Sequence, residues 1–209
     1  MRCYVLTLLL CCAGAGQAQV AEPGKLSARE QGAMAWERSV DVTAWLVPGF
    51  EAGFAMAHPA RNQPPDWSIG ATGFAHLYAG YLARQTAATA AQSATALALG
   101  EDPRYWPSPS GNPMRRAAHA AVFTLFDQRN RGWRRHTVAV SNLVAALTAA
   151  SLANTWQPAQ FQNSTHLAQR TLTSLAGIAG GNLAAEFRPE LTRVARRYRC
   201  FGRRSLQLK

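Results

Sequence analysis

The sequence predicts an all-α protein, a bundle of about five main helices whose packing faces are lined by alanine and glycine. Two observations predict this class. No stretch shows the sustained alternation of β-branched and polar residues that is typical of a strand, so we expect no sheet. In several long segments alanine or glycine recurs every four residues, which places small side chains on one helix face and lets two helices approach closely.

The beginning of the chain has the three parts of a secretory signal peptide. Arg2 supplies a positive charge, residues 3–15 form an apolar run, and small residues follow. The run is shorter than the roughly 20 residues that span a bilayer. We therefore expect a signal peptide over 1–18, a helical domain over 19–191 and a basic C-terminal tail over 192–209. A buried N-terminal helix is the alternative interpretation.

The positions of the cysteines indicate that packing, and not disulfide bonds, stabilises the mature protein. Cys3, Cys11 and Cys12 all lie in the predicted signal peptide, which leaves Cys200 alone in the mature chain. A mature monomer therefore has no internal disulfide, even in an oxidising compartment. Whether Cys200 pairs with another molecule or has no function stays open.

A capping box starts the first predicted helix. The side chain of Ser27 can accept from the free amides of the first turn, and Glu30 can reach back to the amide of Ser27. We expect this helix to run to about Val47, where Pro48 and Gly49 end it.

Residues 48–66 contain glycine, several prolines, an asparagine and a histidine, and we expect a loop that can contain one short helical turn. Trp36 and Trp45, nine residues apart on the first helix, are expected to reach the core from one broad face. The turn at 64–67 is expected to lead rigidly into the next helix, with Trp67 packed against that helix. A partner-binding role for this turn is the alternative.

The second predicted helix covers 68–99 and has Gly100 as its C-terminal cap. Its small residues form two ridges, one of Ala90, Ala94 and Ala98 and the other of Ala87, Ala91 and Thr95. A proline-rich connection follows over 101–111. Asn112 and Pro113 then cap and start a third helix that reaches about residue 126, with a charged turn over 127–136.

The last two predicted helices cover 137–155 and 164–188. Their small residues are Ala145, Ala149 and Ala153 in the first, and Gly177, Gly180, Gly181 and Ala184 in the second. The segments 85–100, 137–165 and 171–185 contain no charged residue, but they are rich in alanine and threonine, and the mean hydropathy of the chain is −0.15. Spanning helices draw instead on Leu, Ile, Val and Phe, so we favour tightly packed helices in an exported globule over a membrane-embedded bundle.

The net charge of +11 is carried almost wholly by arginine, since lysine occurs only at Lys25 and Lys209. Such a surplus favours polyanions, and export disfavours nucleic acid among them. We expect contact with an anionic membrane surface through the tail residues Arg193, Arg196, Arg197, Arg199, Arg203 and Arg204. A second basic cluster runs over 129–135. A solvated basic end without a partner is the alternative.

Several short segments occur in a characteristic order along the chain: Leu26–Glu30, Val40-Asp41, Ala60–Trp67, Gly70, Gly73-Phe74, Glu101–Trp106, Ser141–Leu143 and Asn182–Glu190. Together they span about residues 26–191. In these segments the chain resembles an uncharacterised family of exported bacterial helical proteins of the acidobacterial type. The resemblance implies a shared helical fold and export, and it implies no activity. The long basic tail departs from the family pattern.

The most suggestive polar cluster lies in the proline-rich connection. Its acid, proline, guanidinium and phenol could close over a ligand, or they could fasten the loop to the core. In the second interpretation, which better explains the proline and aromatic residues, Asp102 caps a turn, Arg104 pairs with Glu186, and Tyr105 and Trp106 fill the end of the bundle. The predicted structural lock comprises Glu101, Asp102, Pro103, Arg104, Tyr105 and Glu186.

The sequence offers little for catalysis or metal binding. No two histidines lie within one helical turn of each other, so we predict neither a metal nor a cofactor. His76 and His119 are expected within helices, as hydrogen-bonded core residues. There is no nucleophile elbow and no phosphate-binding glycine loop.

These observations favour a non-enzymatic protein of the periplasm or the envelope membrane, which acts by association with a membrane or an envelope protein. The alternative is a hydrolase-like enzyme that uses Asp102, Arg104 and Tyr105, together with His76 or His119. Homo-oligomerisation stays open.

Overall fold

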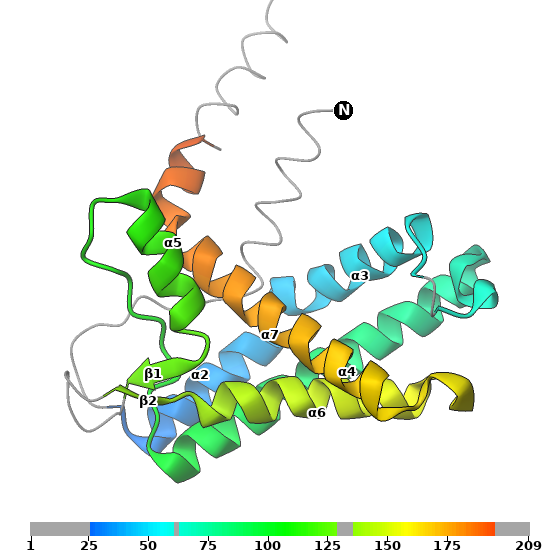
Figure 1. The fold of residues 1–209 in the computed structure, drawn as a ribbon, viewed down its shortest axis with the longest axis horizontal. Coiled ribbons are helices and arrows are strands. Elements are labelled where there is room, and N and C mark those ends of the chain that lie inside the picture. The colour runs from blue at the N-terminus through cyan, green and yellow to red at the C-terminus, as the bar shows by residue number, and fades with distance from the viewer. Residues whose placement is uncertain (1–25, 61–62, 129–135, 195–209) are drawn as a thin grey trace, which may run out of the picture.

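The computed structural model describes residues 26–60, 63–128 and 136–194, and in this part the chain is almost wholly helical (Figure 1). The predicted all-α bundle is confirmed. The long helices are α2 (Ala28–Val40), α3 (Val42–Ala57), α4 (Gly70–Leu99), α5 (Pro113–Val122), α6 (Val140–Trp156) and α7 (Ser164–Glu186). The short 3₁₀ helices are η1 (Pro65–Ser68) and η2 (Ala159–Phe161).

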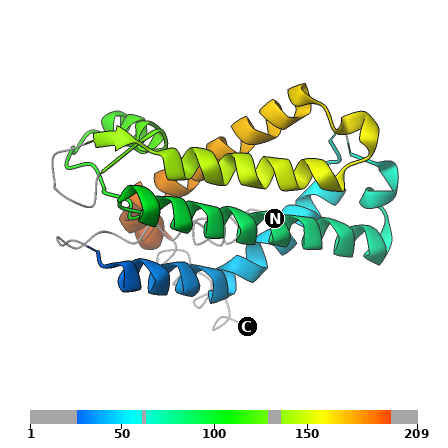
Figure 2. The same cartoon turned by 90° about the horizontal axis from the view of Figure 1, so that it is seen from below.

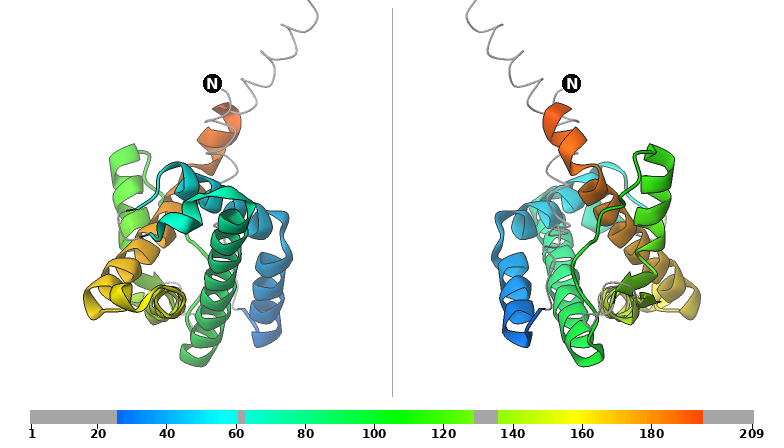
Figure 3. Two further views of the ribbon diagram at one scale, coloured as in Figure 1. Left: turned by 90° about the vertical axis from the view of Figure 1, so that its right-hand side faces the viewer. Right: turned by 90° about the vertical axis from the view of Figure 1, so that its left-hand side faces the viewer.

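Helix α4 is the centre of the bundle. It packs against α2 and α3 on one side and against α6 on the other, and α7 packs on α6 (Figure 2). Viewed from the end of the bundle, α2 and α7 lie on opposite sides of α4 (Figure 3). Helix α5 packs against α7 and is set apart from the other helices.

The capping box is present as predicted, because the Ser27 amide donates to the Glu30 carboxylate at 2.7 Å and the Glu30 amide donates to Ser27 Oγ. The first helix, however, ends at Val40 and not at Val47. Asp41 has extended backbone and caps a new helix, since its carboxylate accepts from the Thr43 amide at 2.8 Å.

The predicted stop at Pro48 is wrong, because Pro48 lies inside α3 and the predicted loop is helical as far as Ala57. Proline has no amide hydrogen, so the carbonyl one turn earlier, that of Ala44, loses its helical donor. The side chain of Gln85 on α4 donates to this carbonyl at 3.4 Å. A tertiary contact therefore replaces the bond that the proline removes.

The predicted lead-in to α4 is confirmed. Trp67 in η1 packs against the core cluster of Ala52, Ala55 and Leu77. Gly73 makes this approach possible, because a Cβ at that position would lie 2.7 Å from the carbonyl oxygen of Trp67. The other end of α4 is also as predicted, with Gly100 in the left-handed region at φ 66°.

Small residues form the contact between α4 and α6, although only one predicted ridge is buried. The buried face of α6 includes Ala145, Ala149 and Ala153, as predicted. On α4, the ridge of Ala90, Ala94 and Ala98 is exposed, so its predicted packing role is wrong. Spacing identifies which residues share a face, whereas the arrangement of the neighbouring helices decides which face is covered.

One short hairpin corrects the prediction of no sheet. Strands β1 (Phe126–Gln128) and β2 (His136–Val138) pair antiparallel, with Phe126 opposite Val138. Helix α5 accordingly ends at Val122 and not near residue 126. Strands of three residues are too short to give a recognisable alternation in the sequence.

Within the described ranges, no helix combines the length and the apolar character that crossing a membrane requires. Several predictions fall outside those ranges: the signal peptide, Cys200, the basic cluster over 129–135, and the tail arginines Arg196, Arg197, Arg199, Arg203 and Arg204. Arg193 is described and exposed.

Candidate functional site

The first residue of the predicted lock, Glu101, caps another helix. Its buried carboxylate accepts from the amide of Val140 at 3.1 Å and from the amide of Ser141 at 3.0 Å, the first two residues of α6. The N-cap residue of α6 is Ala139, which has no side-chain acceptor. A negative charge is favourable at a helix N-terminus, so Glu101 supplies the cap from 40 residues away in sequence.

Asp102 and Arg104 form a buried pair inside the connection. The Nε and Nη2 atoms of Arg104 donate to the two carboxylate oxygens of Asp102 at 2.9 and 2.8 Å, and the Arg104 amide donates to Asp102 as well. Asp102 therefore caps a turn, as predicted. The predicted pairing of Arg104 with Glu186 is replaced, because Asp102 binds Arg104 directly while another arginine binds Glu186. The carbonyl of Pro103 accepts from Arg38 on α2 at 3.0 Å.

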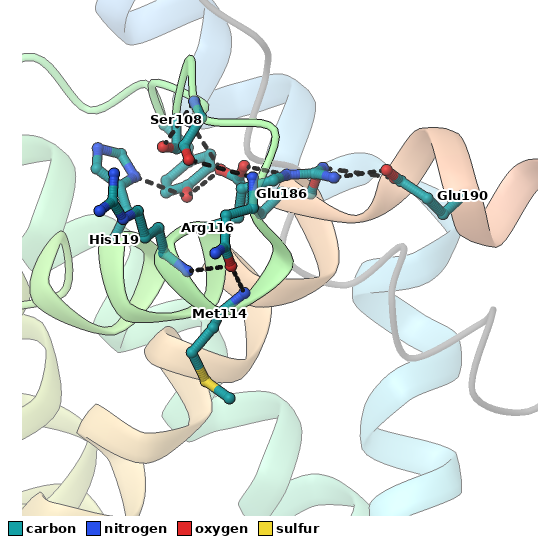
Figure 4. Close-up of polar contacts among 10 residues, drawn as sticks. Ser108, Met114, Arg116, His119, Glu186 and Glu190 are labelled. Atoms are coloured by element: carbon teal, nitrogen blue, oxygen red, sulfur yellow. Dashed lines mark hydrogen bonds and ion pairs between the residues drawn. The ribbon is translucent and has the colours of Figure 1, made fainter.

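Glu186, near the end of α7, is the anchor of the connection (Figure 4). Its carboxylate accepts from the Tyr105 hydroxyl at 2.6 Å, from the Ser108 amide at 3.0 Å and from Arg116 Nε at 2.8 Å. Only 2% of Glu186 is exposed. Burial by itself raises the pKa of Glu186, but the hydrogen bonds from Tyr105, Arg116 and Ser108 outweigh it and hold the pKa below its ordinary value.

For the phenol, burial and the neighbouring carboxylate act in the same direction. Both raise the pKa of Tyr105 far above its ordinary value, so the phenol keeps its proton and donates a hydrogen bond to Glu186. Tyr105 also packs in a buried cluster with Ala120, Phe123 and Ala185, with Trp106 against it. The predicted filling of the bundle end by Tyr105 and Trp106 is confirmed.

Arg116 is the member of the lock that the sequence did not reveal. It binds Glu186 and also Glu190, which follows the end of α7, and these two carboxylates raise the pKa of Arg116. One signal was available. Arg116 and His119 are three residues apart on α5, so they share the face that contains buried Ala120.

The residues of the hydrolase alternative are only partly brought together. Tyr105 Oη lies 3.3 Å from His119 Nδ1. Asp102 and Arg104 instead neutralise each other, and His76 packs on Trp67 with ring centroids 4.1 Å apart. The Nε2 atom of His76 is buried without a hydrogen-bond partner, so the expected hydrogen-bonded core histidine is not found there. In the described ranges, no group of three or more His, Cys, Asp or Glu side chains is placed to hold a metal ion.

Large apolar side chains on α2 and α3 lie on the surface, which contradicts the predicted burial of both tryptophans. Trp36 is 69% exposed and Trp45 is 51% exposed. We call the exposed set the apolar stripe: Trp36, Val40, Val42, Trp45, Leu46 and Phe54. The buried residues of α3 are smaller and include Ala44, Ala52 and Ala55. Helix α3 therefore buries small side chains and exposes large ones.

A groove of about 1220 Å³ lies among α3, α4, α6 and α7. Alanines of α6 and glycines of α7 line much of it, and Arg104, Tyr105 and His76 also reach its surface. A Cβ at Gly177 or Gly180 would have no atom within 4 Å, so this face of α7 meets open space and not a neighbouring helix.

Comparisons of the chain with protein-family models, with curated proteins and with solved structures found no match. The resemblance to exported bacterial helical proteins therefore stays a prediction. The two surfaces just described and the buried lock are the features on which a function has to be argued.

Proposed function

We propose that this is a non-enzymatic, exported protein of the cell envelope that associates with an anionic membrane surface through the apolar stripe of α2 and α3. The observation that carries the proposal is the exposure of the stripe. Exposed apolar patches on proteins mark membrane or protein contact sites. Tryptophan is enriched where protein meets the membrane–water interface, and this stripe contains two.

The charge of the chain supports a lipid surface as the occupant of the stripe. The net charge of +11 attracts anionic lipid headgroups, while the stripe itself holds only uncharged side chains. A protein with this combination is drawn to the surface by its arginines and held there by its apolar residues. The basic tail over 192–209 would add to the attraction.

The pairing inside the buried lock favours a structural role for its charged residues over a catalytic one. Asp102 and Arg104 are paired with each other, and Glu186 accepts three hydrogen bonds from the protein. The first pair shapes the connection itself, and the hydrogen bonds of Glu186 hold the connection to α7.

Sedimentation with vesicles of phosphatidylglycerol and phosphatidylcholine tests the proposal, with the chain from residue 19 onward as the sample. The double variant Trp36→Gln/Leu46→Gln should weaken binding tenfold or more, because burying a large apolar side chain contributes about 1.5–3 kcal/mol. The matched control is Leu172→Gln, which changes an apolar side chain of α7 that is 66% exposed and lies outside the stripe. Equal binding by the double variant and the control would overturn the proposal.

A truncation separates the stripe from the tail. Removal of the residues after Leu191 should abolish binding at low salt if the tail supplies the attraction. If the truncated chain binds as tightly as the full chain while the stripe variant does not, the stripe alone makes the contact.

A further inference from the structure

We propose that the groove among α3, α4, α6 and α7 binds a single-chain amphiphile, whose anionic head is held by Arg84 and Arg170 and whose alkyl chain lies along the small residues of α6 and α7. This site is separate from the apolar stripe and does not depend on the membrane association proposed above.

The two arginines enter the groove from different helices. Arg84 lies in the middle of α4 and Arg170 near the beginning of α7, and both line the groove. Within the described residues, neither guanidinium has a carboxylate at ion-pair distance. Both arginines belong to the lining of the same groove, and burial and then the charge of Arg84 lower the pKa of Arg170.

Arg170 also has unused bonding capacity. It donates to the side chain of Asn154 and to the carbonyl of Phe161, but its buried Nη2 atom has no hydrogen-bond partner among the described residues. A buried donor without a partner is costly, and the cost is greater for a charged group. An anion placed between the two guanidinium groups would satisfy this donor and relieve the repulsion, since planar guanidinium groups bind carboxylates and phosphates well.

One carboxylate on the opposite wall has to be considered. Glu51 on α3 lines the groove and interacts with Arg84, although not at ion-pair distance. Burial raises the pKa of Glu51, and the charge of Arg84 opposes this shift. Glu51 therefore interacts with Arg84, and the positive charge of Arg170 stays available to a ligand. In total, four arginines and two carboxylates line the groove.

The remainder of the groove suits an alkyl chain. Ala145, Ala146 and Ala149 form its floor on α6, and Gly177 and Ile178 line the wall on α7. These surfaces are apolar and have little side-chain volume, so they leave a long depression open. A groove of about 1220 Å³ exceeds the 300–1,000 Å³ typical of compact ligands and accommodates an extended one.

Calorimetric titration of the chain from residue 19 onward with laurate, below its micellar concentration, tests the proposal. We expect saturable binding of one laurate, binding at least tenfold weaker for methyl laurate, and no detectable binding of inorganic phosphate. Lauroyl lysophosphatidic acid, with the same chain, shows whether a phosphate head is preferred to a carboxylate. Equal affinity for laurate and its methyl ester, or phosphate binding as tight as laurate binding, would overturn the proposal.

Variants locate the site. Arg84→Gln and Arg170→Gln should each weaken laurate binding tenfold or more, whereas Arg115→Gln, on the exposed surface of α5, should leave it unchanged. Gly177→Leu fills the groove at a position with free space, so it should weaken binding while the melting temperature is kept or raised. Full laurate affinity in Gly177→Leu would contradict the placement of the chain. The stripe variant Trp36→Gln/Leu46→Gln should bind laurate normally, which separates this inference from membrane association.

Discussion

The lock and the groove differ in how their charged side chains are paired. In the lock, each buried carboxylate has partners: Glu101 holds two amides of α6, Asp102 holds Arg104, and Glu186 holds a phenol, an amide and a guanidinium. In the groove, Arg84 and Arg170 lie together with no carboxylate at ion-pair distance among the described residues. Arg84 lies over the ring of Tyr81 and Arg170 donates to Asn154 and Phe161, so what this pair of cations lacks is an anionic partner. A satisfied network fastens a fold, whereas two such cations leave a place for an anion.

The two regions also differ in side-chain size. The lock is packed with Tyr105 and Phe123, which fill the space between α5 and α7. Aromatic side chains such as Trp67 and Tyr81 also line the groove, but alanines of α6 and glycines of α7 form much of its surface, and its α7 wall meets open space at Gly177 and Gly180. Packed aromatic residues therefore fill the space between α5 and α7, whereas small residues leave the α7 wall of the groove open.

Removal of the anchor should break this contrast most strongly. Glu186→Ala removes one of the two carboxylates that bind Arg116 and the acceptor of the Tyr105 hydroxyl, and breaking a buried ion pair costs about 3–5 kcal/mol in the free energy of unfolding. Urea denaturation followed by circular dichroism measures this change. Glu190→Gln is the control, since Glu190 also binds Arg116 but its side chain is 42% exposed. A similar loss in both variants would show that burial does not distinguish the two carboxylates.

The same anchor predicts a dependence of stability on pH. The pKa of Glu186 is held below its ordinary value of 4.5 in the folded protein, so its contribution is complete above that value. The contribution should be lost as the pH falls through the lowered pKa, because the unfolded chain then binds the proton more readily. Glu186→Gln should show a smaller loss of stability on acidification than the unchanged protein, as measured by denaturation midpoints between pH 6 and pH 3.

Removal of a single hydrogen bond should have a smaller effect. Tyr105→Phe keeps the ring in its cluster and deletes only the donor to Glu186, and a hydrogen bond to a charged group contributes about 1.5–3 kcal/mol. Thermal melting reports the loss. Tyr81→Phe is the matched control, because Tyr81 borders the groove and its hydroxyl forms no hydrogen bond with another of the described residues. Equal melting temperatures for the two variants would contradict a role for the phenol proton.

Loss of a helix cap should be smaller again. Glu101→Ala removes the acceptor for the first two amides of α6, and a cap contributes about 0.5–2 kcal/mol. Hydrogen exchange at Val140 and Ser141 should accelerate in this variant before exchange in the middle of α6 does. Unchanged protection of these two amides would mean that another group caps the helix.

The smallest expected effect is the change in stability on replacing either of two glycines by alanine, and the two changes should have opposite signs. Gly177→Ala should stabilise the protein by about 0.5–1 kcal/mol, because alanine is the better helix former and a Cβ there meets no atom within 4 Å. Gly73→Ala should destabilise it, because the new Cβ would lie 2.7 Å from the Trp67 carbonyl oxygen. The same substitution in two helices thus tests whether the groove is open, and equal shifts in melting temperature would refute it.

Signals that act within one helical turn were readable in the sequence. The capping pair of Ser27 and Glu30, the start at Asn112 and the left-handed Gly100 all occur where they were predicted. Each depends on atoms a few residues apart, so no knowledge of the rest of the fold is needed. The lock itself was predicted as a set of residues, with Arg116 missing and the partner of Arg104 misassigned.

Features that depend on distant atoms were not readable. Pro48 is a helix breaker by every local rule, yet α3 continues through it because Gln85 supplies a donor to the Ala44 carbonyl. Trp45 has the apolar character of a core residue, yet it is exposed, and small residues occupy the buried side of α3. In both cases a contact with α4 reverses the local expectation.

The sequence by itself determined that the chain forms helices, where most of them begin and end, and which small residues share a face. Only the tertiary structure decided which faces are covered, which carboxylate meets which arginine, and that Arg84 and Arg170 share one groove. The physical reason is the distance along the chain over which each interaction acts. Backbone hydrogen bonding and steric preferences act within about one helical turn. Burial and pairing of charge join residues up to 81 positions apart and exist only once the helices have packed.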